Sequence, residues 1–143
     1  MFFFLDKLLP LMYLLTDPKA SSYHFQARMQ VKYLKSVTYC KDIIAWKRNR
    51  DSLAAYQDTM ENSGYAVQCT QNVAEIADNC NLIVTATPAR KPLIQADQVR
   101  KGTHIAAMGS DTPEKQELDP KIFQKADIVV ADSIEQCVRF IRR

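Results

Sequence analysis

The stretch that decides the fold is "NLIVTAT", residues 81–87, an apolar run that ends in polar residues. A strand that is apolar on both faces is typical of the centre of a parallel sheet, where helices cover both sides. A second run of the same character, "ADIVVAD", occupies residues 126–132. Together the two runs predict an α/β protein.

Helical and strand-like patterns alternate on both sides of this stretch. The spacing predicts helices over 24–37, 50–64, 71–80 and 133–143, and strands over 42–46, 65–69, 81–87, 102–109 and 126–132. The helix over 50–64 carries Leu53, Tyr56 and Met60 on one side, with Asn49 placed to cap its start and Gly64 to end it. Such alternation indicates parallel β-α-β units. We therefore expect a Rossmann-like, doubly wound parallel sheet, which binds ligands beyond the carboxyl ends of its strands.

The composition excludes several classes of protein. With 47% hydrophobic and 24% charged residues, the chain resembles a globular domain with a core. A net charge of +3 with no basic stripe argues against nucleic acid as a partner. Four scattered cysteines without a C-x-x-C motif, and only two histidines, argue against a metal site. Reduced thiols in a cytoplasmic protein are the simpler interpretation.

The beginning of the chain, "MFFFLDKLLPLMYLLTDP", differs from the rest. It is apolar enough to suggest a membrane anchor, but Asp6 and Lys7 interrupt it, and Pro10 breaks it. It is also shorter than the roughly 20 apolar residues that a spanning helix needs. We expect residues 1–23 to be an atypical apolar segment ahead of a domain over 24–143. A membrane-attached protein is the less favoured alternative.

Several motifs after these strands occur together in one known family. They are "FQARMQ", "WKRN", "LIVTATPARKPLI", "GTHIAAMGSDTPEKQELDP" and "ADIVVADSIEQC". In their order and spacing over residues 24–137 the chain resembles the ornithine cyclodeaminase/mu-crystallin family. The resemblance implies a Rossmann domain that binds NAD or NADP, and a substrate domain that also makes the dimer contact. The implied reactions are conversion of ornithine to proline and ammonia, reduction of imino acids, or dehydrogenation of amino acids. This chain resembles the nucleotide-binding domain.

The resemblance also implies roles for single residues. Asp111, in the G-x-D segment, corresponds to a general base beside the nicotinamide, where imine chemistry needs a proton moved. The alternative is that Asp111 only turns the chain before Pro113. The implied cofactor-binding residues are Gln26, Ala27, Lys47, Arg48, Asn49, Thr85, Ala86, Thr87, Met108 and Gly109. Among these, Gly109 would let the backbone approach the cofactor, although "TATP" could also simply end a strand.

The segment "WKRNR", residues 46–50, bears on the choice of nucleotide. NAD-selective sites place an acid after this strand to bind the ribose hydroxyls. The chain has Lys47, Arg48 and Arg50 instead, and cations suit a 2'-phosphate, so NADP is favoured over NAD. The alternative is a solvated basic turn.

The chain departs from the family pattern at its phosphate loop. Counting back from Ala27, the two glycines of G-x-G-x-x-A are Ser22 and His24 here, which argues against tight pyrophosphate binding. The first strand's place is taken by "TDPKASS", unless "LMYLL" at 11–15 replaces it with a long loop over 16–24. The substrate domain is also missing. We therefore expect a truncated, incomplete fold that is inactive alone, or a non-catalytic interaction module without nucleotide binding.

Overall fold

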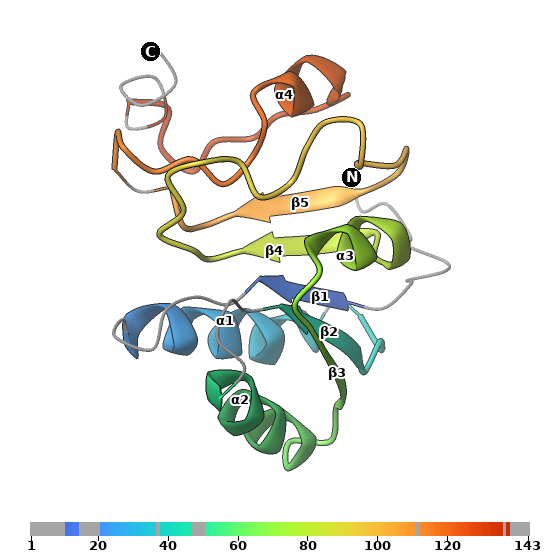
Figure 1. Ribbon diagram of the computed structural model, residues 1–143. Helices are drawn as coiled ribbons and strands as arrows, with labels where there is room; N and C mark the ends of the chain where they lie inside the picture. Colours follow the sequence, from blue (N-terminus) through green and yellow to red (C-terminus); the bar gives the residue numbers. More distant parts are fainter. Residues whose placement is uncertain are drawn as a thin grey trace.

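The computed structural model describes residues 11–14, 21–36, 38–46, 51–110, 112–135 and 137. In this part of the chain, five parallel strands form one sheet in the order β3-β2-β1-β4-β5, so β3 and β5 lie at its two edges (Figure 1). The strands are β1 (Leu11–Leu14), β2 (Asp42–Trp46), β3 (Ala66–Thr70), β4 (Leu82–Thr85) and β5 (His104–Ala107). The helices are α1 (Ser21–Leu34), α2 (Asp51–Glu61), α3 (Val73–Asn79) and α4 (Lys121–Lys125). The predicted doubly wound parallel sheet is confirmed.

The first strand of the fold comes from the apolar beginning of the chain. Strand β1 lies in the centre of the sheet, where Leu11 is paired with Ile43 on one side and with Leu82 on the other. The alternative in which "LMYLL" replaces the first strand is therefore confirmed, and the sheet has no gap at its centre. Helix α1 begins at Ser21, so the last part of the predicted loop over 16–24 is helical instead. The four residues of β1 give β2 and β4 the backbone partners that a central strand must supply.

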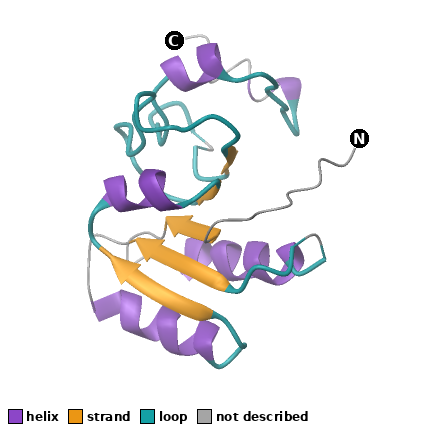
Figure 2. Cartoon of the chain, turned by 90° about the vertical axis from the view of Figure 1, so that its right-hand side faces the viewer, coloured by secondary structure: helices purple, strands orange, loops and turns teal. Residues whose placement is uncertain are grey.

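The two faces of the sheet are covered by different helices, and the views in Figures 1 and 2 show helices on both sides of the strands. One face packs against α1 and α2. Its buried cluster includes Val31, Ile43, Ala45, Leu53, Tyr56, Met60, Val67 and Val84. The other face packs against α3, α4 and the segment after β4, with a cluster that includes Ile44, Trp46, Ile76, Ile83, Ile94, Leu118 and Ile122. Each fully buried aliphatic side chain contributes about 1.5–3 kcal/mol. Neighbours in β2 and β4 point to opposite faces, as the apolar run in 81–87 predicts.

Helix α2 has the inward side and the end that the sequence predicts. Leu53, Tyr56 and Met60 are all buried in the core. After the helix, the backbone N–H of Gly64 donates to Glu61 O (2.9 Å), and that of Tyr65 donates to Met60 O (3.2 Å). This pair of bonds ends a helix with a left-handed residue, and Gly64 has φ of +84°. A glycine is favoured here because other residues rarely adopt that conformation.

The last part of the described chain differs from the prediction. The expected strand over 126–132 is wrong: this segment has no regular structure, and the exposed fractions of Ile128, Val129 and Val130 are 71%, 56% and 86%. An apolar run becomes a strand only where a neighbouring strand pairs with it, and β5 is the edge of the described sheet. The predicted helix over 133–143 lies mostly outside the described residues.

Helix α4 precedes this segment and was not predicted. It is five residues long, and its Ile122 packs into the second cluster. A carboxylate oxygen of Asp119 accepts a hydrogen bond from the backbone N–H of Lys121 (2.9 Å), and this bond lowers the pKa of Asp119. At the other end, Nζ of Lys125 donates to Ala96 O (2.8 Å). Tertiary contacts of this kind stabilise a helix too short to form alone.

No helix within the described residues has the length and hydropathy needed to cross a membrane.

Candidate active site

The carboxyl ends of β4 and β5 are joined by one buried carboxylate. The Glu117 side chain is fully buried, and it accepts hydrogen bonds from Thr85 Oγ1 (2.8 Å), Thr87 N (2.5 Å) and Gly109 N (2.9 Å). Thr85 is the last residue of β4, Thr87 follows it by two residues, and Gly109 follows β5. Both carboxylate oxygens accept, so this one side chain bonds residues at the ends of both strands.

Gly109 is required at this point by close packing. A Cβ atom at this position would overlap the backbone N and O of Thr87 and Oε1 of Glu117. The close approach that the structure contains is therefore between two strand-end segments of the chain itself. The predicted contact of Gly109 with a cofactor stays a prediction.

The predicted site residues at the end of β4 and just after it are buried as well. Thr85, Ala86 and Thr87 are 0–1% exposed. The hydroxyl of Thr85 donates to Glu117, and Thr87 Oγ1 accepts a hydrogen bond from Ala89 N (3.2 Å). These threonines therefore hold the strand-end segment in place, and a ligand at this edge would not meet their hydroxyls directly. Met108 is different, because its side chain is 43% exposed at the end of β5.

Other predicted site residues cannot be compared with the structure. Asp111, Lys47, Arg48 and Asn49 lie outside the described residues. Gln26 and Ala27 are placed in α1, but their side chains are not described. Their assigned roles stay predictions. Trp46, next to this group at the end of β2, is buried, and its indole N–H donates to Gln71 O (2.9 Å).

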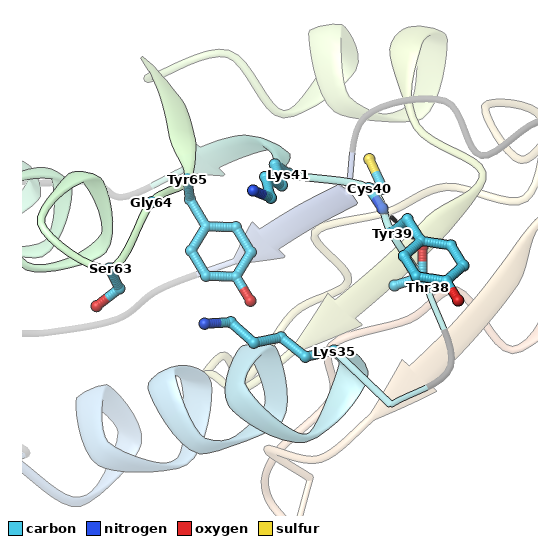
Figure 3. Close-up of a pocket in the computed structure, with 8 residues that line it drawn as sticks. All are labelled: Lys35, Thr38, Tyr39, Cys40, Lys41, Ser63, Gly64 and Tyr65. Atoms are coloured by element: carbon cyan, nitrogen blue, oxygen red, sulfur yellow. Dashed lines mark hydrogen bonds between the residues drawn. The ribbon is translucent and has the colours of Figure 1, made fainter.

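A cavity of about 300 Å³ lies at the opposite end of the strands (Figure 3). Its lining includes Lys41, just before β2, and Tyr65, just before β3. Figure 3 shows Lys35 reaching over the Tyr65 ring, with Nζ 5.1 Å from the ring centre. Because doubly wound folds bind ligands at the carboxyl ends of their strands, this cavity does not correspond to the predicted nucleotide site.

Within the described residues, no group of three His, Cys, Asp or Glu side chains is arranged to hold a metal ion.

Comparison with known proteins agrees with this geometry. The model of the ornithine cyclodeaminase/mu-crystallin family matches residues 24–139. The chain belongs to this family. Alanine dehydrogenase of Archaeoglobus fulgidus is 39% identical over 111 residues, which are 78% of this chain and 34% of the relative. The chain thus spans about a third of the length of this curated relative of the family.

Solved structures of related proteins share the fold. An archaeal alanine dehydrogenase dimer with bound NAD has a TM-score of 0.75 and 32% identity, covering 90% of this chain and 38% of that one. The iminosuccinate reductase of Paracoccus denitrificans, in complex with NAD⁺, has a TM-score of 0.69 and 26% identity, covering 94% and 42%. The part of these proteins that this chain resembles is the NAD-binding Rossmann fold.

The start of α1 stands where the family motif has its phosphate loop. Helix α1 follows the central strand and begins at Ser21, and the first backbone N–H groups of any helix lack partners within the helix. Pyrophosphate binds such a helix start in doubly wound folds. In this chain Ser22 and His24 stand in the first turn of α1, in place of the glycines of the family motif. The strand order and the position of α1 are those of a doubly wound fold, whereas the glycines of the motif are absent.

Sequence reasoning missed the central residue of this site. Glu117 is part of the motif "ELDP" that helped to identify the family, but it received no role. The residues around Glu117 give little signal of its role, because two of its three hydrogen-bond donors, Thr85 and Thr87, lie about 30 residues earlier in the sequence.

Proposed function

We propose that this chain binds a nicotinamide dinucleotide along the carboxyl edge of its sheet. The nicotinamide half would lie beyond the ends of β4 and β5, and the pyrophosphate would lie at the start of α1. The observation that carries the proposal is the parallel order β3-β2-β1-β4-β5, whose direction of winding reverses between β1 and β4. Ligands of doubly wound proteins bind at this reversal. Relatives with bound NAD and NAD⁺ support the same choice of ligand.

Within the family, the nucleotide would serve hydride transfer between amino and imino acids, or the cyclodeamination of ornithine. Asp111 would move the proton, since it follows β5 by a few residues and the family resemblance assigns it that role. The matched relatives are about three times longer than the part that this chain covers. We therefore propose that turnover requires a substrate-binding part in addition, supplied by a partner or a larger assembly. The four cysteines, none of which forms a disulfide, support a cytoplasmic setting.

We further propose a preference for NADP over NAD. Lys47 and Arg48 follow β2, where a 2'-phosphate would lie, and no acid occurs in "WKRN". Two cations at this position can bind a phosphate that NAD lacks. A matched pair of variants tests the preference: Lys47→Ala should weaken NADPH binding and leave NADH binding unchanged, whereas Lys101→Ala, remote from β2 in sequence, should affect neither.

The first experiment is a titration of the chain with NADPH and NADH. Trp46 is the only tryptophan and lies at the end of β2, so quenching of its fluorescence reports binding at this edge. We expect saturation at micromolar ligand, and ligand at about 100 times Kd should stabilise the fold by about 2.7 kcal/mol in a thermal scan. A flat titration together with an unshifted melting curve would contradict the proposal.

One observation favours a second function, that of an interaction module without a nucleotide. Ser22 and His24 replace both glycines of the phosphate loop, and Ile128, Val130 and Ile134 are all more than 70% exposed. Exposed apolar side chains in one segment are typical of surfaces that contact another protein. Concentration-dependent association of a chain that ignores both nucleotides, measured by sedimentation, would support this alternative.

A further inference from the structure

We propose that Glu117 is a positioning residue that holds the ends of β4 and β5 in the arrangement that receives the nicotinamide half of the dinucleotide. This inference rests on the proposed function. Glu117 is fully buried, and it is not among the residues that the sequence assigns to the cofactor.

The first argument is the way in which the carboxylate is bonded. A buried charge is costly unless hydrogen bonds compensate it, and Glu117 has three of them with a fully buried side chain. Oε2 accepts from Thr85 and Gly109, so one oxygen joins the two strands, and Oε1 accepts from Thr87. Each bond to a charged group is worth about twice a neutral one. The strand ends are bonded directly by Met108 N, which donates to Thr85 O (2.7 Å), and the carboxylate ties the residues just beyond them, Thr87 and Gly109, to each other.

The second argument is that Glu117 is itself held firmly from the other side. Its carbonyl oxygen accepts hydrogen bonds from the backbone N–H groups of Leu93 (2.8 Å) and Ile94 (3.4 Å). The next residue, Leu118, forms a parallel bridge with Ile94 and is buried in the core. Since the backbone on which the carboxylate is mounted belongs to the core, the side chain can impose a position on the strand ends.

The third argument is that the bonds are confined to one end of the strands. At the opposite end, β5 is held to β4 by a separate bond from His104 N to Asn81 O (2.7 Å). Loss of the carboxylate should therefore alter the carboxyl edge and leave the rest of the sheet in place. Glu117 acts through Thr87 and Gly109, because its own oxygens are buried and already bonded.

The test replaces Glu117→Gln in the full chain and measures two ligands. NADH reports the whole site, and ADP-ribose, which lacks only the nicotinamide ring, reports the site without the contacts of that ring. The amide keeps the shape of the side chain but presents one oxygen, so at least one of the two backbone N–H donors, of Thr87 or Gly109, loses its partner. We expect NADH affinity to fall about tenfold or more, to that of ADP-ribose, while ADP-ribose affinity stays unchanged.

Glu75→Gln is the matched control. Glu75 accepts a hydrogen bond from a threonine at the end of another strand, Thr70 Oγ1 to Oε2 (2.6 Å), so the chemical change is the same. In this variant the ratio of the affinities for NADH and ADP-ribose should equal the ratio in the unsubstituted chain. If Glu117→Gln does not fold, Thr85→Val removes one of the three bonds and should give a smaller loss in the same direction, for NADH alone.

The outcomes separate the two claims. If NADH binds the unsubstituted chain and Glu117→Gln equally well, or if both ligands weaken together in the variant, the positioning role is wrong while nucleotide binding stands. If neither ligand binds the unsubstituted chain, the proposed function fails, and this inference fails with it.

Discussion

The close packing around Gly109 gives the sharpest prediction, which concerns Gly109→Ala. A methyl group at this position would overlap Thr87 N, Thr87 O and Oε1 of Glu117. None of these atoms can give way easily, because Thr87 and Glu117 are fully buried and bonded to each other. The φ angle of Gly109 is not positive, so backbone strain adds nothing to the loss of stability in Gly109→Ala. The loss comes from the overlap and from the contacts that the overlap breaks.

The magnitude follows from what must move. Overpacking of a filled site costs roughly 1–3 kcal/mol. Separating the segments also breaks the bond from Gly109 N to Glu117, and a hydrogen bond to a charged group is worth about 1.5–3 kcal/mol. Alanine also lowers the conformational entropy of the unfolded chain, which offsets the loss of stability by about 0.4–1 kcal/mol. We expect a net destabilisation of about 3 kcal/mol, a large part of the roughly 5–15 kcal/mol that stabilises a domain.

Gly102→Ala is the comparison for this variant. Gly102 has φ of +81°, and a Cβ atom there meets no atom within 4 Å. Its cost is the left-handed backbone alone, about 1 kcal/mol. Urea unfolding followed by circular dichroism measures both variants, and the difference should appear as a lower midpoint for Gly109→Ala with an unchanged slope. Equal midpoints for the two variants would refute the reasoning that the strand ends are locked together.

Three further predictions follow from burial. Ile83→Ala should destabilise the chain by about 2–5 kcal/mol in urea unfolding, because Ile83 is 0% exposed, whereas Val130→Ala, at an 86% exposed position, should change stability by less than about 0.5 kcal/mol. Burial raises the pKa of Tyr56 above its value in the unfolded chain. The stability that this shift contributes is therefore complete below pH about 10 and is lost as the pH rises further. Tyr56→Phe should make the unfolding free energy fall less steeply above pH about 10, and an unchanged fall would show that another group is responsible. Burial also raises the pKa of Cys80 to about 12, so iodoacetamide followed by mass spectrometry should label the exposed Cys69 before Cys80, which should react only on unfolding. Early labelling of Cys80 would show that the second face of the sheet opens readily.

The elements predicted well from the sequence are those with a local cause. Helix α2 is recognised from the spacing of Leu53, Tyr56 and Met60 and from Gly64, all of which lie within one segment. Strand β4 is recognised because a run apolar on both faces suits only a covered sheet. In each case the residues that specify the element are the residues that form it.

The elements predicted poorly depend on distant partners. Residues 126–132 have the composition of a strand, but composition does not say whether a neighbouring strand is there to pair with them. Helix α4 depends on Asp119 and on the packing of Ile122. The bonds of Glu117 come from Thr85 and Thr87, about 30 residues earlier, so nothing near Glu117 indicates that it is buried. The first strand stayed open between two alternatives for the same reason, since its partners are β2 and β4.

The position of β1 has a consequence for how the chain folds during synthesis. Leu11–Leu14 is made before both of its neighbours in the sheet, β2, which starts at Asp42, and β4, which starts at Leu82. One neighbour, β2, is made early, but the other side of this apolar strand stays unpaired until β4 is made, after more than half of the 143 residues. Contacts between residues so far apart in sequence form slowly, and apolar segments exposed in the meantime are prone to aggregation. We expect a chaperone that shields nascent apolar segments to raise the yield of folded chain, because the sheet closes at its centre only when β4 arrives.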